Sequence, residues 1–231
     1  MKLHRFFIEE EIGERKTLEI KTEHLLHQWR NVLRFAVGDK VILFDGKGSD
    51  FLCEISALTK NISNLDVLEE TKGIIPSKKI TLFISLIKRE NFELVLEKAT
   101  ELGVSRIVPV IADRSEKKSL NYERALKIVV EASEQSGRTN IPVLGETMTT
   151  EEAVDRYKKE LSFFAFDPTG SFDYKLTTKS YNLGLLIGPE GGFTPAELEF
   201  FAEKEIPIVK LGEQILRAET ASIVALSRVM F

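Results

Sequence analysis

The sequence has 231 residues, of which 43% are hydrophobic and 29% are charged, with a formal net charge of −4 at pH 7. A chain of this length buries a sizeable core and predicts two domains. The net charge is small and negative, so it does not indicate a nucleic-acid partner. Any surface that binds nucleic acid has to be a local cluster of basic residues.

The composition also indicates the cellular compartment and whether the protein binds a metal. No stretch approaches the roughly 20 apolar residues of a membrane helix, and the first ten residues carry charges where a signal peptide has its apolar core. We therefore expect a cytoplasmic protein. Cys53 is the one cysteine and lies in a strand-like run, which predicts a buried thiol and no disulfide. With His4, His24 and His27 it forms no metal-ligand spacing, and we predict no metal.

Hydrophobic residues alternate with a period of two over most of residues 2–70, the pattern of a small β domain. It predicts strands over 3–9, 40–55 and 61–70, the second folded at the turn Asp45-Gly46. One helix is predicted over 22–35, with its apolar stripe at Leu25, Trp29, Val32 and Leu33. The opposite face carries His27, Arg30 and Arg34, either as a solvated surface or as a ridge that contacts phosphates.

Residues 71–79 mix Gly, Pro and Lys and are predicted to be a linker, after which the periodicity changes. A strand over 80–87, a helix over 91–103 and a strand over 106–111 form a βαβ unit, with Asn91 as N-cap and Gly103 just past the helix. The remainder predicts strands and helices in a mostly parallel α/β sheet. The helices are 122–135, 151–159 behind a Thr149/Glu152 capping box, 195–204 and 219–230; the strands are 161–166, 181–188 and 206–212.

The sequence Gly188-Pro-Glu-Gly-Gly-Phe193 follows an apolar strand and precedes a capping box at Thr194 and Glu197. Ligands of open α/β sheets bind beyond the carboxyl ends of the strands, and glycines let the backbone approach them closely. This spacing argues against ATP and NAD as ligands, because no lysine follows Gly192 and the G-x-G-x-x-G pattern is absent. A carboxylate at Glu190 would also repel a pyrophosphate. A purely structural turn is the alternative.

A second strand, loop and helix follow, with Leu211-Gly212 ending the strand and Arg217-Ala-Glu219-Thr220 at the helix start. Helix capping and a local ion pair would explain Glu219 and Thr220. They do not explain Arg217, a cation near the positive end of a helix.

LLIGPEGGFTPAE together with LGEQILRAETA resembles the RsmE family of ribosomal RNA methyltransferases, in the SPOUT superfamily. KRENFELVLEKATELGV, EASEQSGR, HRFF and RNVLRF match as well, so the resemblance covers nearly the whole chain. The spacing around His24 and His27 departs from the family pattern and leaves the role of either histidine open.

The resemblance implies a PUA-like β-barrel domain that binds RNA over 1–70, a linker over 71–79 and a SPOUT α/β domain with a trefoil knot over 80–231. Knots are rare exceptions to the topology rules, and no local pattern predicts one. The resemblance also implies a homodimer, S-adenosylmethionine (SAM) as cofactor, and methylation of N3 of a uridine in 16S rRNA, within the small ribosomal subunit. Competing hypotheses are a SPOUT methylase acting on another RNA nucleotide and a non-catalytic RNA-binding assembly factor.

The expected cofactor contacts follow from the same resemblance. The catalytic and RNA-binding candidates are hypotheses from the residues themselves, and surface ion pairs are the alternative for each RNA-binding cation. Arg217 is the expected catalytic donor, with Glu219 or Glu190 as the base. The apolar end Val229-Met230-Phe231 is either a dimer surface or packing within one subunit. Expected cofactor contacts are Leu186, Ile187, Gly188, Pro189, Glu190, Gly191, Gly192, Leu211, Gly212, Ile215, Leu216, Ala218, Thr220 and Ala221; expected RNA contacts are Arg5, Arg30, Arg34, Lys88, Arg89, Arg114 and Arg138.

Overall fold

The computed structural model describes residues 3–73, 76, 78–171 and 181–230. The chain forms two compact units. The first contains Met1–Ile75 together with Ser133–Ile141, and the second contains Pro76–Ala132 together with Pro142–Phe231. The chain therefore leaves the second unit once, near residue 133, and returns to it at residue 142.

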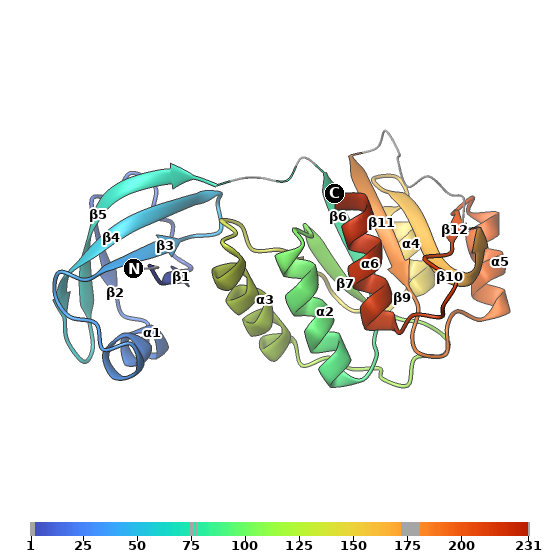
Figure 1. Cartoon of the computed structure of the whole chain (residues 1–231), viewed down its shortest axis with the longest axis horizontal. Coiled ribbons are helices and arrows are strands. Elements are labelled where there is room, and N and C mark those ends of the chain that lie inside the picture. The colour runs from blue at the N-terminus through green and yellow to red at the C-terminus, as the bar shows by residue number, and fades with distance from the viewer. Residues whose placement is uncertain (1–2, 74–75, 77, 172–180, 231) are drawn as a thin grey trace. The chain divides into compact units, whose positions relative to one another are not determined.

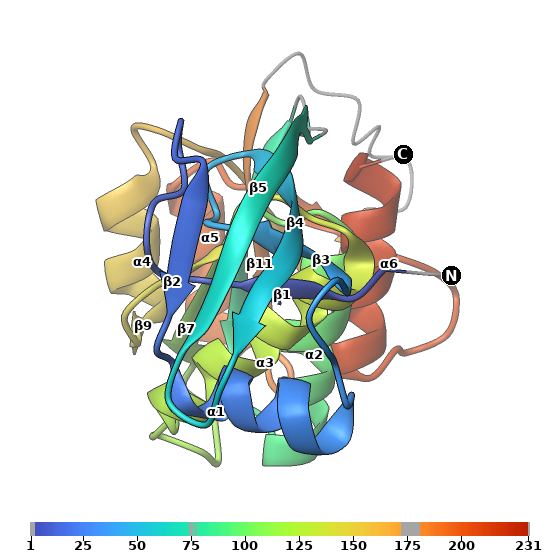
Figure 2. The same ribbon diagram turned by 90° about the vertical axis from the view of Figure 1, so that its left-hand side faces the viewer.

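The first unit is built on a five-stranded sheet in the order β1-β3-β4-β5-β2. All neighbours are antiparallel except β1 and β3, which are parallel. Figure 2 looks onto this sheet, with β2, β5 and β4 side by side. The predicted β domain is confirmed, and β2 is a strand that the sequence analysis did not predict. The strands are β1 Arg5–Phe7, β2 Thr17–Ile20, β3 Lys40–Phe44, β4 Ser49–Leu58 and β5 Ser63–Lys72.

The predicted helix begins as α1 (Glu23–His27) and continues as a π-helical turn, Gln28–Val32. In that turn the amide of Leu33 donates to the carbonyl of Gln28, five residues earlier, at 2.9 Å. A π turn has more residues per turn than an α-helix, so the apolar stripe shifts. Two positions of the predicted stripe, Leu25 and Trp29, are buried as expected. Val32 is 65% exposed, so its placement on that stripe was wrong.

Arg5 joins the segment after residue 132 to the β sheet within the first unit. Its Nη1 donates to the carbonyls of Ser133 and Glu134 at 3.4 and 3.3 Å, and its Nη2 donates to the carbonyl of Arg138 at 3.0 Å. The same Nη2 forms an ion pair with Asp50. Arg5 is therefore a structural cross-link between distant parts of the chain.

The second unit has a sheet in the order β12-β10-β11-β6-β7-β8, with β9 paired to the end of β7. Every pairing recorded in this sheet is parallel, which confirms the predicted α/β class. Figures 1 and 2 show α2 and α6 on one face of the sheet and α4 on the other. The strands are β6 Lys79–Ser85, β7 Arg106–Ile111, β8 Val143–Leu144, β9 Met148–Thr149, β10 Ser162–Ser171, β11 Asn182–Ile187 and β12 Ile208–Val209.

The helices agree with the prediction to within a few residues. They are α2 Arg89–Glu101, α3 Tyr122–Ser136, α4 Thr150–Tyr157, α5 Pro195–Glu203 and α6 Ala218–Met230. Both capping boxes, at Thr149 and Thr194, are present. Gly103 has φ +93°, as expected of a residue that ends a helix. Asn91 was wrongly placed as an N-cap, because α2 already begins at Arg89 and its N-cap is Lys88.

The proposed linker, 71–79, overlaps the end of β5 and the start of β6, while 74, 75 and 77 lie outside the described residues.

Val229 is buried within its own subunit and Met230 lies against Gly103, which favours the packing explanation for the apolar end; Phe231 is outside the described residues. Of the helices in the described part of the chain, none combines the length and apolar character that crossing a membrane demands. The trefoil knot stays a prediction of the family resemblance.

Candidate active site

The glycine loop, Gly188–Phe193, connects the carboxyl end of β11 to α5, as predicted. Gly192 has φ +67°, a conformation that other residues adopt only with strain, and its amide donates to the carbonyl of Pro189 at 2.9 Å. The Thr194 side chain accepts from the amide of Glu197, and the Glu197 carboxylate accepts from the amide of Thr194. The loop is thus fixed at both ends by regular structure.

Two other glycines in the loop have little room for a side chain. A Cβ at Gly188 would lie 3.3 Å from the ring of Phe193, and a Cβ at Gly191 would lie 3.3 Å from Cδ of Arg114. Nη1 of Arg114 donates to the carbonyls of Gly191 and Phe193 at 2.8 and 3.2 Å. The loop therefore presents bare backbone on a rigid support, which is the arrangement a ligand cradle needs.

A pocket of about 580 Å³ lies beside this loop. It has the size of a small-molecule or cofactor site. Three segments toward the carboxyl ends of neighbouring parallel strands supply most of its wall, which is the ligand position expected in an open α/β sheet. The lining residues are Phe166–Thr169 in the second half of β10, Ile187–Phe193 from the end of β11, and Val209–Gly212 with Gln214–Ala218 from the end of β12, together with Arg114, Pro195, Leu198 and Ala221.

Most of the cofactor contacts expected from the sequence lie in this wall. Two do not: Leu186 is fully buried in the core, and Thr220 is exposed outside the lining. Those that line it are Ile187, Gly188, Pro189, Glu190, Gly191, Gly192, Leu211, Gly212, Ile215, Leu216, Ala218 and Ala221.

The sequence analysis missed the contribution of β10. Phe166 pairs with Ile187, so Asp167 and Gly188 are the next residues along two adjacent strands. Asp167 is 8% exposed, and its Oδ1 accepts from the amide and the hydroxyl of Thr169 at 2.9 and 2.7 Å. The only available signal was Asp-Pro-Thr directly after an apolar run, and it becomes informative once β10 is known to lie beside β11.

The three catalytic candidates occupy different environments. Arg217 is exposed and lines the pocket. Glu190 also lines it, and its Oε1 accepts from the amide of Lys88 at 3.2 Å. Glu219 is 8% exposed and lies outside the lining; its Oε2 has no hydrogen-bond partner among the described residues.

The expected RNA contacts also separate by environment. Arg30 and Arg34 on the first unit, and Lys88 and Arg89 on the second, are exposed. Arg5 is 11% exposed at its side chain and bonded internally. Burial lowers the pKa of Arg138 to about 10, which marks a guanidinium withdrawn from solvent.

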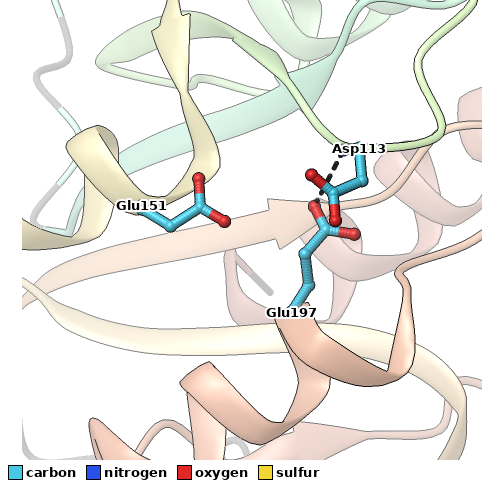
Figure 3. Close-up of side chains that lie close together, drawn as sticks. All are labelled: Asp113, Glu151 and Glu197. Carbon is cyan, nitrogen blue, oxygen red and sulfur yellow. Dashed lines mark hydrogen bonds between the residues drawn. The ribbon is translucent and has the colours of Figure 1, made fainter.

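Asp113, Glu151 and Glu197 bring carboxylate oxygens within 4.8 Å of one another (Figure 3). Local hydrogen bonds explain two of them. Glu197 accepts from the amide of Asp113 at 3.2 Å, and Asp113 accepts from the hydroxyl of Thr194 at 2.9 Å. We interpret the cluster as part of the support of the glycine loop.

The fold and pocket define an RNA methyltransferase that carries a PUA domain. The family model for an RNA methyltransferase domain matches residues 75–230, and the model for an RNA methyltransferase PUA domain matches residues 30–68. The chain belongs to the RsmE family, the ribosomal RNA small subunit methyltransferases E.

Relatives of that name align along almost the full length. The Rickettsia conorii protein is 33% identical over 99% of this chain and 96% of its own, and the Bacillus subtilis protein is 30% identical over the same shares. The crystal structure of the Neisseria gonorrhoeae protein, bound to S-adenosyl methionine, is 29% identical. It superposes with a TM-score of 0.91 over 98% of this chain and 96% of that one.

Proposed function

We propose that this protein transfers the methyl group of SAM to N3 of a uridine in 16S rRNA, within the small ribosomal subunit. The observation that carries the proposal is the pocket that the glycine loop after β11 forms with residues of β10 and with the segment after β12. Family membership and the SAM-bound relative support the choice of cofactor. An rRNA substrate favours the cytoplasm as the place of action.

The residues present fit such a cofactor. Gly188, Gly191 and Gly192 line the pocket with backbone, and Cβ atoms added there would meet Phe193, Arg114 and Asp167, which line it as well. We assign cofactor contact to the lining residues already predicted from the sequence, and we leave out Leu186 and Thr220. When bound, SAM supplies an electrophilic methyl group on a sulfonium.

The chain's own task is to prepare the nucleophile. Uridine N3 carries a proton at neutral pH, so the site has to remove that proton or stabilise the resulting anion. Arg217 is exposed at the pocket wall and always charged, which suits a donor to the uracil oxygens and excludes it as a base.

Two carboxylates remain as candidates for the base. Glu190 lies in the pocket wall, but its Oε1 already accepts from the backbone of Lys88. Glu219 has a free Oε2 but is buried beyond the wall, within the first turn of α6. We favour Glu190 because it lies in the lining.

The RNA surface is proposed from the exposed cations. Arg30 and Arg34 would contact phosphate on the first unit, and Lys88 and Arg89 on the second. We omit Arg5 and Arg138, which the first unit uses internally. Arg114 is assigned to the glycine loop through its two carbonyl contacts.

A homodimer remains part of the proposal. One feature supports it: Ile215, at the mouth of the pocket, is 83% exposed although it is a large aliphatic residue. A second copy covering this loop would remove that apolar side chain from water. Sedimentation equilibrium of the purified chain measures the state directly.

The test of function combines cofactor binding and product analysis. Calorimetric titration with S-adenosylhomocysteine (SAH) should show a saturable site. Incubation with SAM and unmethylated small ribosomal subunits, followed by nucleoside mass spectrometry, should show repeated formation of 3-methyluridine. A different methylated nucleoside would favour the alternative SPOUT substrate. SAH binding without turnover would favour the assembly factor.

A further inference from the structure

We infer that Asp167 binds the ribose hydroxyls of the cofactor and that Thr169 orients its carboxylate for this role. The inference rests on the proposed function and adds a binding residue that lies outside both glycine-containing motifs. The two carboxylate oxygens of Asp167 have different surroundings. Asp167 is buried to more than nine-tenths, and hydrogen bonds from Thr169 occupy Oδ1.

The other oxygen, Oδ2, has no hydrogen-bond donor among the described residues. It faces the glycine loop, since a Cβ built on Gly192 would lie 3.7 Å from it. Asp167 itself forms part of the pocket wall. Oδ2 is not one of the fully buried oxygens without a partner, so it is accessible from the pocket, and a ligand there can supply the donors that the protein does not.

The bonds from Thr169 give this carboxylate a fixed direction. Its amide and hydroxyl hold the same oxygen at 2.9 and 2.7 Å, which restrains rotation of the carboxylate. Gly170 anchors the segment behind it, because a Cβ there would lie 2.6 Å from backbone atoms of Ile208 in β12. The acceptor is therefore held in place before the ligand arrives, which lowers the entropic cost of binding.

The position of Asp167 decides which ligand group it meets. In dinucleotide-binding sheets a glycine loop follows one strand, and a carboxylate at the end of a neighbouring strand accepts from ribose hydroxyls. Here the glycine loop follows β11, and Asp167 directly follows the last pair between β10 and β11, Phe166 with Ile187. The glycine spacing differs from the dinucleotide fingerprint, but the relation of loop, strand and carboxylate is the same.

The experiment compares three probes by calorimetry on wild type, Asp167→Asn and the control Asp155→Asn. The control removes an exposed carboxylate outside the pocket, which forms an ion pair with Lys204. The probes are SAH, 5′-methylthioadenosine, which keeps the ribose but lacks the amino-acid part, and 2′,3′-dideoxy-5′-methylthioadenosine, which lacks the hydroxyls.

We expect Asp167→Asn to weaken SAH and 5′-methylthioadenosine by the same factor, on the order of 10- to 100-fold. The dideoxy probe should bind this variant and the wild type alike, because its hydroxyls are already absent. Thr169→Val keeps the carboxylate but loses one of its two restraints, so a smaller loss with the same probe pattern is expected even if Asp167→Asn fails to fold.

Two results would overturn the inference. If Asp167→Asn weakens SAH and leaves 5′-methylthioadenosine unchanged, the carboxylate meets the amino group of the cofactor. If it weakens the dideoxy probe as much as 5′-methylthioadenosine, or weakens no probe, the ribose is not its partner. Failure of the proposed function looks different, because the wild type itself would then bind neither SAH nor 5′-methylthioadenosine.

Discussion

The adjacent glycines Gly191 and Gly192 should respond differently to alanine. Gly191 has no positive φ, and its new Cβ would meet only the stem of Arg114, at 3.3 Å from Cδ and 3.4 Å from Cβ. Arg114 has to give by only a few tenths of an ångström to relieve these contacts. Gly192 has φ +67°, where an alanine loses roughly 1–2 kcal/mol of backbone free energy even though its nearest neighbour is 3.7 Å away.

Urea unfolding measures the difference. Gly192→Ala should lower the free energy of unfolding by roughly 1–2 kcal/mol, and Gly191→Ala by no more than about 0.5 kcal/mol. Gly192→Asn is the matched control, because asparagine tolerates this conformation better and should restore part of the stability.

Cofactor binding should depend on Gly191 even though stability depends more on Gly192. Gly191→Val places a branched side chain on the bare backbone and should abolish SAH binding while the fold stays intact. The reasoning is refuted if Gly191→Val binds SAH with normal affinity, or if Gly191→Ala loses as much stability as Gly192→Ala.

Further predictions concern single side chains. Arg217→Ala should keep SAH affinity and lose methyl transfer; unchanged transfer would remove Arg217 from the mechanism. Thr194→Ala should cost about 1 kcal/mol of stability in denaturant titration and Thr194→Ser almost none, because the capping bond to Glu197 is 3.2 Å and needs a hydroxyl. Burial raises the pKa of Cys53 to about 12, so at pH 8 the group stays a neutral thiol and should react with a disulfide reagent only on unfolding. Arg30→Ala and Arg34→Ala should each reduce the slope of log affinity for RNA against log salt concentration by about one. An unchanged slope would mean that the RNA does not contact that residue.

Most helices and strands could be predicted because the signals that define them lie in consecutive residues. Period-two alternation marked β3, β4 and β5, and the capping box at Thr194 and Glu197 set the start of α5. The glycine loop was placed correctly for the same reason: a strand, a loop and a helix start are read from consecutive residues. Val32 shows the limit, since a single π turn moved it out of the stripe that a period of 3.6 predicts.

Long-range pairing accounts for what the sequence could not predict. Arg5 appears as an exposed cation on a short strand until its bonds to Ser133, Glu134 and Arg138 are known. Nothing near Arg5 in the sequence indicates that a segment more than 120 residues away supplies its acceptors. A charged residue was therefore assigned to RNA although the fold uses it internally.

Asp167 is the converse case, a residue that gains its meaning only from its neighbour in the sheet. Its local sequence, Asp-Pro-Thr-Gly after an apolar run, is typical of an ordinary turn. The parallel pairing of β10 with β11 brings the carboxylate next to the glycine loop, and the pairing of β10 with β12 adds the segment that carries Arg217. Strand order thus assembles one pocket from three segments that are separate in sequence, and a motif search that examines each segment alone finds the glycines but misses the carboxylate beside them.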